Sequence, residues 1–397
     1  MTKLLAQHGT AKGKKIDFAL SSHYISGAIF SPREESFTSI QKYCSDSTLL
    51  TNDTCYLDPQ LYYSTFDGKI FKHLEDDICY PEKITRRDWR KKTPELMNYI
   101  EKHATNSASI SDILITPGFF IQTLDWHFDY SLDIYNHCCE NYSFRKYYLS
   151  LLISNNFFHS KSDVDEMLED ILDNIDYKEG IYLTICYDKT DEKDYEYIDP
   201  QNLTNILYFI HSLNTAGFDI MVGYSFMNSV LFAMLNCEAV ATGWFNNIRK
   251  FNRDRFEESE TMGRRKKRYT SLPLFTYITF DNLNNASQSI ALDDLLSGCI
   301  IDEYMSNSQD SISFVDLEQQ YWQALSIIIE QINHYNSLSD RINHVLSELT
   351  NAKKLYASIL NTLTDNKEAF NRIKSTSKHL DSWIMGIETF KNRISLF

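Results

Sequence analysis

Short apolar runs alternate with segments of helical periodicity over the first three quarters of the chain. Two of them, YYLSLLIS from Tyr147 and IYLTICY from Ile181, are apolar almost throughout. Strands of a parallel sheet have this composition because crossover helices bury both of their faces. The sequence therefore predicts an α/β protein with a parallel sheet. The eight runs are Ile16–Leu20, Thr54–Leu57, Ile113–Thr116, Tyr147–Ser154, Ile181–Tyr187, Phe218–Tyr224, Ala239–Thr242 and Leu272–Phe280.

The segments between these runs carry helix signals. Asp199-Pro200 places a proline at the first helical position, and Leu203, Ile206 and Ile210 follow at helical spacing. Eight strands alternating with helices over about 280 residues predict a (β/α)8 TIM-like barrel. A doubly wound open sheet is the alternative, because the number of strands does not by itself establish closure. We assign the barrel domain to residues 1–314.

Beyond residue 314 the pattern becomes wholly helical. Leu317, Tyr321, Leu325 and Ile328 mark the first of several amphipathic helices. From Val315 to Phe397 nine Lys and Arg balance nine Asp and Glu, so the formal charge of −15 belongs to the barrel region. We predict a helical C-terminal domain over residues 315–397. It either docks on the barrel wall or forms a homodimer or binds a protein partner.

The composition excludes several classes of protein. No run approaches the roughly 18 apolar residues of a membrane span, and no signal peptide is recognisable, so we expect a soluble, cytoplasmic protein without membrane contact. The eight cysteines form no C-x-x-C pair, which argues against a zinc site. Asp125, His127 and Asp129 do not share one helix face, so we predict no metal there. Glycine-rich phosphate fingerprints are absent as well, and we expect no cofactor.

In a barrel, the functional groups lie where the strands end. Asp58 and Asp188 each follow a predicted strand and could act as general base, nucleophile or partner of a cationic transition state. The alternative is a helix cap or turn. His23, after the first run, is a third catalytic candidate or a structural histidine. The same rule nominates six substrate-binding residues, which are Gln60, Asn155, Tyr187, Tyr224, Trp244 and Asn246.

Positive charge is concentrated in two extended loops, 83–92 and 249–268, each with a local charge of +5. A chain of net charge −15 should not attract polyanions over its whole surface, but local patches can. Both loops leave predicted strand ends, so we expect them to share the barrel mouth and to bind nucleic acid; a solvated loop is the alternative. The predicted phosphate contacts are Arg86, Arg87, Arg90, Arg249, Arg253, Arg264, Arg265 and Arg268.

Three further segments are predicted to lie at this barrel mouth. They are LDPQLY from Leu57, GWFN from Gly243, and GRR followed by RYTS between Gly263 and Ser271. A barrel with carboxylates and basic loops at its mouth resembles the tRNA-guanine transglycosylase superfamily and its relatives that act on DNA bases in phage-defence loci. The resemblance is one of architecture over residues 16–280. It implies action on a base of a nucleic acid, with a role in antiviral defence.

The chain departs from that superfamily in three ways. The Asp-Ser-Gly-Gly-Phe-Gln stretch is replaced by Thr116-Pro117-Gly118-Phe119-Phe120, the zinc-binding cysteines are missing, and GWFN lacks the nucleophilic Asp. Hydrolytic removal of a base requires less: a pocket that stacks the base, and a carboxylate that stabilises the cationic sugar and orients water.

The sequence thus leads to one main functional hypothesis. We expect a DNA or RNA glycosylase, an N-glycosidic-bond hydrolase, or a transglycosylase that exchanges a modified base. Two alternatives remain open, namely a non-catalytic module that binds nucleic acid or protein, and a barrel enzyme for a phosphorylated small molecule.

Overall fold

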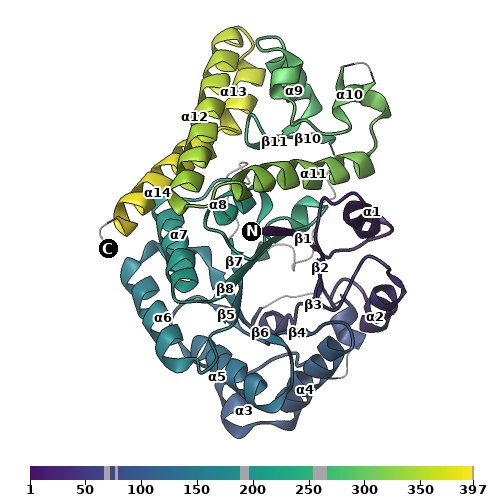
Figure 1. Ribbon diagram of the computed structural model, residues 1–397, viewed down its shortest axis with the longest axis vertical. Coiled ribbons are helices and arrows are strands. Elements are labelled where there is room, and N and C mark those ends of the chain that lie inside the picture. Colours follow the sequence, from purple (N-terminus) through teal and green to yellow (C-terminus); the bar gives the residue numbers. More distant parts are fainter. Residues whose placement is uncertain (67–71, 77–78, 188–195, 254–265, 307, 396–397) are drawn as a thin grey trace.

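The computed structural model describes residues 1–66, 72–76, 79–187, 196–253, 266–306 and 308–395. Figure 1 shows a ring of helices around a strand barrel, with a further layer of helices on one side. Among the described residues no helix is long and apolar enough to cross a membrane.

The barrel is a parallel sheet in the order β3-β2-β1-β9-β8-β7-β6-β4, and the short strand β5 also pairs with β6. The two end strands, β3 and β4, lie in contact, so eight strands form a nearly closed barrel. This confirms the predicted fold class. The strands are β1 (Lys3–Gln7), β2 (Ala28–Phe30), β3 (Cys55–Leu57), β4 (Ile113–Ile115), β5 (Phe120–Ile121), β6 (Lys146–Ser154), β7 (Gly180–Cys186), β8 (Asp219–Gly223) and β9 (Ala239–Thr242).

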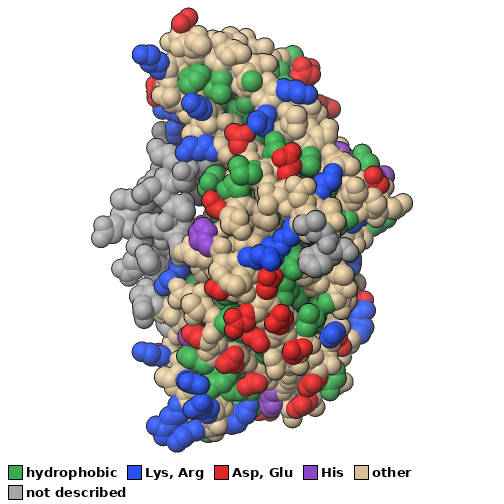
Figure 2. All heavy atoms as spheres, turned by 90° about the vertical axis from the view of Figure 1, so that its left-hand side faces the viewer, with side chains coloured by type: hydrophobic (Ala, Val, Ile, Leu, Met, Phe, Trp, Pro, Cys, Tyr) green, Lys and Arg blue, Asp and Glu red, His purple; other side chains and the backbone are tan. Residues whose placement is uncertain are grey.

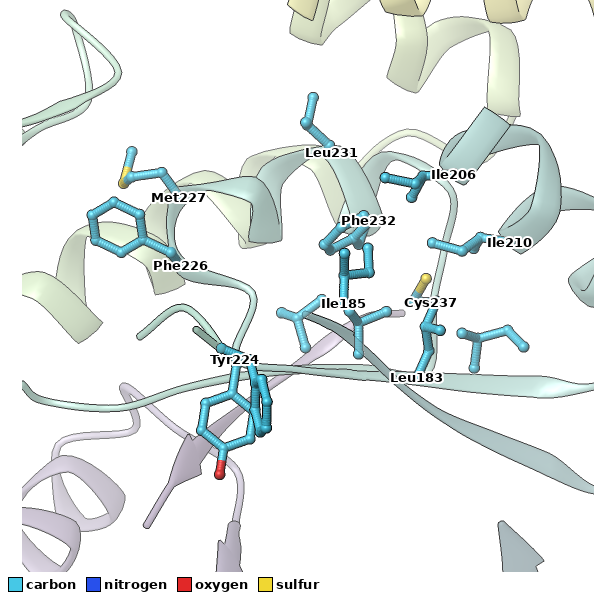
Figure 3. Packing of buried hydrophobic residues seen from close by; sticks show 14 of the residues in the cluster. Leu183, Ile185, Ile206, Ile210, Tyr224, Phe226, Met227, Leu231, Phe232 and Cys237 are labelled. Atoms are coloured by element: carbon cyan, nitrogen blue, oxygen red, sulfur yellow. The ribbon is translucent and has the colours of Figure 1, made fainter. Parts of the chain in front are cut away.

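Alternate residues of each strand point into the barrel, as the two-residue period of a strand requires. Leu183 and Ile185 of β7 point outward, toward Ile206 and Phe232 of the surrounding helices (Figure 3). The inward-facing set fills the barrel as a separate core, which makes it a packed interior rather than a pore. Its members are Leu5, Ile29, Tyr56, Ile113, Ile115, Tyr148, Tyr182, Met221, Ala239 and Ala241.

Two of the eight predicted strands are wrong. The run Ile16–Leu20 lies within helix α1 (Lys15–Ser21), and the first two barrel strands are instead β1 and β2. The run Leu272–Phe280 contributes to an antiparallel hairpin outside the barrel, formed by β10 (Arg268–Ser271) and β11 (Thr276–Thr279). The other six predicted runs coincide with barrel strands.

Helices cover the outside of the barrel between successive strands (Figure 1). The region between β9 and α11 contains the β10–β11 hairpin and two short helices, α9 and α10. The barrel helices are α2 (Phe37–Asp46), α3 (Arg86–Lys91), α4 (Pro94–Ala108), α5 (Trp126–Asn141), α6 (Lys161–Asn174), α7 (Pro200–Thr215) and α8 (Ser229–Met234), and the two short ones are α9 (Phe280–Ala286) and α10 (Asp302–Met305).

The C-terminal region is helical, as predicted, and comprises α11 (Phe314–Asn333), α12 (Leu338–Thr362), α13 (Lys367–Ser375) and α14 (Lys378–Ile394). Helix α11 packs against α1, α8 and β1, so it belongs to the wall of the barrel. Helix α14 packs on α7, and α12 lies against both α8 and α14. The predicted boundary after residue 314 therefore falls at a helix that lies directly on the barrel.

Candidate functional site

Polar side chains gather where the barrel strands end. Gln7 ends β1, Ser31 follows β2 and Asp58 follows β3, while Thr184 lies in β7 and Tyr224 follows β8. All five are at least 97% buried. Because the carboxyl ends of parallel strands meet at one end of a barrel, this group forms a polar layer above the apolar interior.

Asp58 is fully buried, and its contacts include three neutral donors. Its Oδ1 accepts the backbone N–H of Gln60 at 3.2 Å, and its Oδ2 accepts the hydroxyls of Tyr62 at 2.9 Å and Tyr182 at 3.4 Å. Burial, and then the nearby Asp58 carboxylate, raise the pKa of both tyrosines well above the ordinary value. Both phenols therefore stay protonated at neutral pH and donate to the carboxylate.

The turn after β3 explains why Asp58 and Tyr62 meet. Gln60 has a φ of 57°, a left-handed conformation that turns the chain into the 3₁₀ helix η1 (Leu61–Thr65). The Gln60 amide fixes this turn, because it donates to Ser31 Oγ at 2.6 Å and accepts the N–H of Arg33 at 3.0 Å. Gln60, predicted to bind substrate, thus uses its side chain to join the ends of β2 and β3.

A histidine that the sequence analysis missed lies beside this network. His8 follows β1 and is fully buried; its Nδ1 accepts the N–H of Ser31 at 3.4 Å, and its Nε2 lies 3.2 Å from Glu35 Oε2. Lys12 also binds Glu35, at 2.9 Å. The signal for His8 is the apolar run KLLAQ that precedes it, which forms the first strand in place of the predicted Ile16–Leu20.

We expect the hydrogen bond of Glu35 with His8 and its ion pair with Lys12 to stabilise the protein in a pH-dependent way. The hydrogen bond from His8 is the main cause that lowers the pKa of Glu35 to about 2, from an ordinary value near 4.5. A carboxyl group with a lowered folded-state pKa stabilises the fold above its unfolded pKa, and this contribution is lost as the pH falls from about 4.5 to 2. Urea unfolding of Glu35→Gln should therefore show a smaller loss of stability than wild type between pH 5 and pH 3. Equal losses in the two proteins would contradict this assignment.

Aromatic rings form a wall next to Asp58. Tyr62 meets Phe251 edge to face at 5.5 Å, and Phe66 meets Phe120 in the same way at 5.3 Å. The guanidinium of Arg253 lies 5.4 Å from the Phe66 ring and 5.6 Å from that of Phe120. The site thus combines a carboxylate, flat apolar surfaces and one of the predicted cationic residues.

Several buried polar atoms near the strand ends have no hydrogen-bond partner among the described residues. They include Nε2 of Gln7, whose Oε1 accepts the Tyr182 hydroxyl at 3.5 Å, and Oγ1 of Thr184. Buried polar groups usually have partners, because burying them without one is unfavourable. An amide donor and a hydroxyl are therefore available to a ligand.

Several predicted site residues lie elsewhere. His23 is exposed in the connection from α1 to the amino end of β2, away from the strand ends that carry Asp58. Trp244 is fully buried; its Nε1 donates to the Thr10 carbonyl at 3.2 Å, and its ring packs edge to face on Trp322 at 5.9 Å. With both faces enclosed, Trp244 has no surface on which to stack a base.

The remaining substrate-binding candidates follow the ends of β6 to β9 but do not form one cluster. Asn155 is half-buried, and its carbonyl accepts Asn202 Nδ2 at 2.9 Å. Tyr187 is buried under the ammonium of Lys250, which lies 3.8 Å from the ring centroid. Asn246 is exposed. Tyr224 packs edge to face on Phe251 at 5.1 Å and so continues the aromatic wall.

The predicted phosphate contacts are dispersed. Arg249 is buried; its Nε donates to the Gly243 carbonyl, and its guanidinium lies 3.5 Å from the Tyr321 ring centroid. Arg268 is half-buried in β10 and donates to the Tyr277 carbonyl at 3.2 Å. Three others, Arg86, Arg87 and Arg90, are exposed on α3. The candidates Asp188, Arg264 and Arg265 lie outside the described residues.

Helix α3 belongs to the outer ring and not to the barrel mouth. Its buried Trp89 donates to Asp133 of α5 at 2.9 Å and packs on Tyr130 of the same helix. Figure 2 shows Lys and Arg side chains gathered at the lower end of the molecule, where Figure 1 places α3. The basic residues of α3 thus lie on the outer ring of helices, and most of the segment 249–268 lies outside the described residues.

Asp125, the first residue of the segment 125–129, has a structural role. Asp125 caps α5 by accepting the N–H of His127 at 3.0 Å, and it also binds the His127 ring. Within the described part of the chain, no three His, Cys, Asp or Glu side chains form a group that could hold a metal ion.

Comparisons of the chain with protein-family models, curated proteins and solved structures find no match.

Proposed function

We propose that this barrel acts on nucleic acid and cleaves the N-glycosidic bond of a base, with Asp58 as the catalytic carboxylate. The observation that carries the proposal is the position of Asp58, buried at the carboxyl end of β3 beside an aromatic wall. Enzymes that act on a base flip it out of the stack and hold it between flat apolar side chains. The Tyr62, Phe66, Phe120 and Phe251 rings are flat and apolar but at least 95% buried, so a base would reach them only after the side chains that cover them move.

The chemistry uses the charge of Asp58. When the bond between the sugar and the base breaks, its electron pair leaves with the base and the sugar becomes oxocarbenium-like. A fixed carboxylate stabilises that cation and accepts a proton from the water that adds to C1′; the departing base takes a proton from solvent water, and Asp58 returns its proton to the solvent. Tyr62 and Tyr182 hold Asp58 in place and need no reorganisation during the reaction.

The open hydrogen-bonding groups of the mouth suit a base edge. Gln7 Nε2 can donate to a carbonyl or ring nitrogen, and Thr184 Oγ1 can donate or accept. A base presents both kinds of group on its Watson–Crick edge. These two residues would therefore contribute to the choice of base.

The test is the release of free base. Purified protein is incubated with unmodified and modified DNA and RNA, single- and double-stranded, and the supernatant is analysed by mass spectrometry. Release of one base, with an abasic site left in the strand, supports a glycosylase. Uptake of an isotope-labelled free base into the strand identifies exchange instead. If no base is released and no labelled base is taken up with any of these substrates, the proposal is wrong.

Helix α3 provides a separate prediction about backbone contacts. Arg86, Arg87 and Arg90 are exposed and form no ion pair within 4 Å among the described residues. If they contact phosphates, the triple Ala variant should bind a polynucleotide more weakly, and the slope of log affinity against log salt should fall by about two to three. Fluorescence anisotropy over a salt series measures both. A triple Ala variant of the exposed Lys353, Lys354 and Lys367, on α12 and α13, serves as control; equal effects would indicate nonspecific attraction.

A second candidate function has its own observation. Arg249 follows β9, the last barrel strand, and its buried Nη1 has no partner among the described residues. Loops after the last two strands commonly bind a phosphate group in barrel enzymes. If the protein is a barrel enzyme for a phosphorylated small molecule, inorganic phosphate should stabilise it against unfolding. No base should then be released from nucleic acid.

A further inference from the structure

A cavity of about 390 Å³ lies between α1 and α11. Its lining comes from these two helices, from Tyr24 after α1, and from residues 300, 301, 304, 311 and 312. Its volume falls within the range of small-molecule sites in proteins. Nothing in the proposed reaction at Asp58 uses this cavity. The lining residues are Phe18, Tyr24, Ile300, Ile301, Tyr304, Ser311, Ile312, Asp316, Gln319, Gln320 and Gln323.

The cavity has aromatic walls that are left uncovered. Phe18 and Tyr304 are each 51% exposed and Ile300 is 63% exposed, which is unusual for large apolar side chains grouped at one place. The rings of Phe18 and Tyr24 lie 6.4 Å apart and are tilted toward each other. Aromatic faces carry negative potential and attract organic cations.

The polar lining consists mainly of acceptors. Asp316 provides the only charged side chain among the described lining residues, and it is exposed. Gln319 is 93% buried and donates its Nε2 to the Lys15 carbonyl at 3.1 Å, while its Oε1 has no hydrogen-bond partner among the described residues. The Oε1 of Gln323 is already occupied by the N–H of Ile300 at 3.1 Å. Two acceptors of the lining therefore call for a donor, namely the Asp316 carboxylate, one oxygen of which already accepts the Ser313 N–H, and Gln319 Oε1.

We propose that this cavity binds a small organic cation with an apolar, aromatic body and N–H donors. The aromatic walls take the body and favour its charge, Asp316 neutralises it, and Gln319 Oε1 accepts an N–H. An anion would meet a carboxylate and two aromatic faces and would find no Lys or Arg among the described lining residues. The proposal is independent of the reaction at Asp58.

Benzamidine, which has these properties, tests the proposal by calorimetry on the full chain, with benzoate as a matched anion of the same shape. We expect saturable binding of one benzamidine per chain and no saturable binding of benzoate. Phe18→Ala removes an exposed wall and should weaken binding about tenfold. Asp316→Asn keeps an acceptor for the Ser313 N–H, which Asp316 now binds at 2.7 Å, but removes the charge, and should weaken binding severalfold.

A control separates this cavity from the barrel mouth, which also combines a carboxylate with aromatic rings. Asp58→Asn should leave benzamidine affinity unchanged, and loss of binding in that variant would overturn the proposal. Equal affinity for benzoate, absence of saturable benzamidine binding, or full affinity in both Phe18→Ala and Asp316→Asn would overturn it as well.

Discussion

Asp58→Asn should reduce base release about a thousandfold while leaving the affinity for the polynucleotide within a factor of two of wild type. The loss has this size because one preorganised charge at a developing cation contributes a factor of roughly a hundred to a thousand to the rate. Binding is retained because the aromatic wall and the basic residues are unchanged. Single-turnover release of base, followed by mass spectrometry, gives the rate, and anisotropy gives the affinity.

A matched variant tests whether the activity of Asp58 depends on the hydrogen bond from Tyr62 that holds its carboxylate in place. Tyr62→Phe keeps the ring against Phe251 and removes only the hydroxyl that lies 2.9 Å from Asp58 Oδ2. It should lower the rate about tenfold, since one hydrogen bond to a charged group is worth about 1.5–3 kcal/mol and part of it is lost. If Asp58→Asn releases base at the wild-type rate, Asp58 is structural and a binding module becomes the better interpretation.

Trp322→Ala should lower the free energy of unfolding by about 4 kcal/mol, the largest stability effect that we expect from one substitution. Trp322 of α11 is fully buried, its Nε1 donates to the Thr242 carbonyl at 3.0 Å, and its ring meets Trp244. Removing it leaves a cavity between α11 and the end of β9. Urea unfolding, followed by far-ultraviolet circular dichroism, measures the difference.

Two further variants separate the effects of volume and hydrogen bonding. Trp322→Phe retains most of the ring and leaves the Thr242 carbonyl without its donor, so it should cost about 1–2 kcal/mol. Met385→Ala, at a side chain that is 54% exposed on α14, should change stability by less than about 0.5 kcal/mol. A Trp322→Ala protein as stable as wild type would mean that α11 does not contribute to the barrel wall.

The sequence predicted most of the barrel because buried parallel strands leave a strong signal. The long runs of β6 and β7 are apolar on both faces, and their identification follows from composition alone. The prediction of a strand at Ile16–Leu20 is wrong because Ile16, Ala19 and Leu20 are buried on one face of a helix. A run of five residues is too short to separate this helical pattern from that of a strand. The three-residue strand β2 is too short for any periodicity to be visible.

The candidate site was predictable only in part. Asp58 was found because topology places it after β3, and the structure brings it together with Tyr62 and Tyr182 from sites 4 and 124 residues away along the chain. Trp244 and Arg249 follow a strand in the same way, yet both are buried as structural groups. Sequence position indicates which end of the barrel a residue occupies, but it does not show whether the side chain faces the mouth or packs behind it.

The first strand depends on segments that are far away in the sequence. Strand β1 pairs on one side with β2 and on the other with β9, and the backbone of Thr2 exchanges two hydrogen bonds with Asn333, which is 331 residues later. During synthesis the first of these partners emerges early, whereas β9 and α11 emerge only after most of the chain has left the ribosome. Contacts of such long sequence separation form slowly, because a long loop must close before they are made. We therefore expect the edge of β1 that pairs with β9 to stay unpaired until most of the chain has been synthesised.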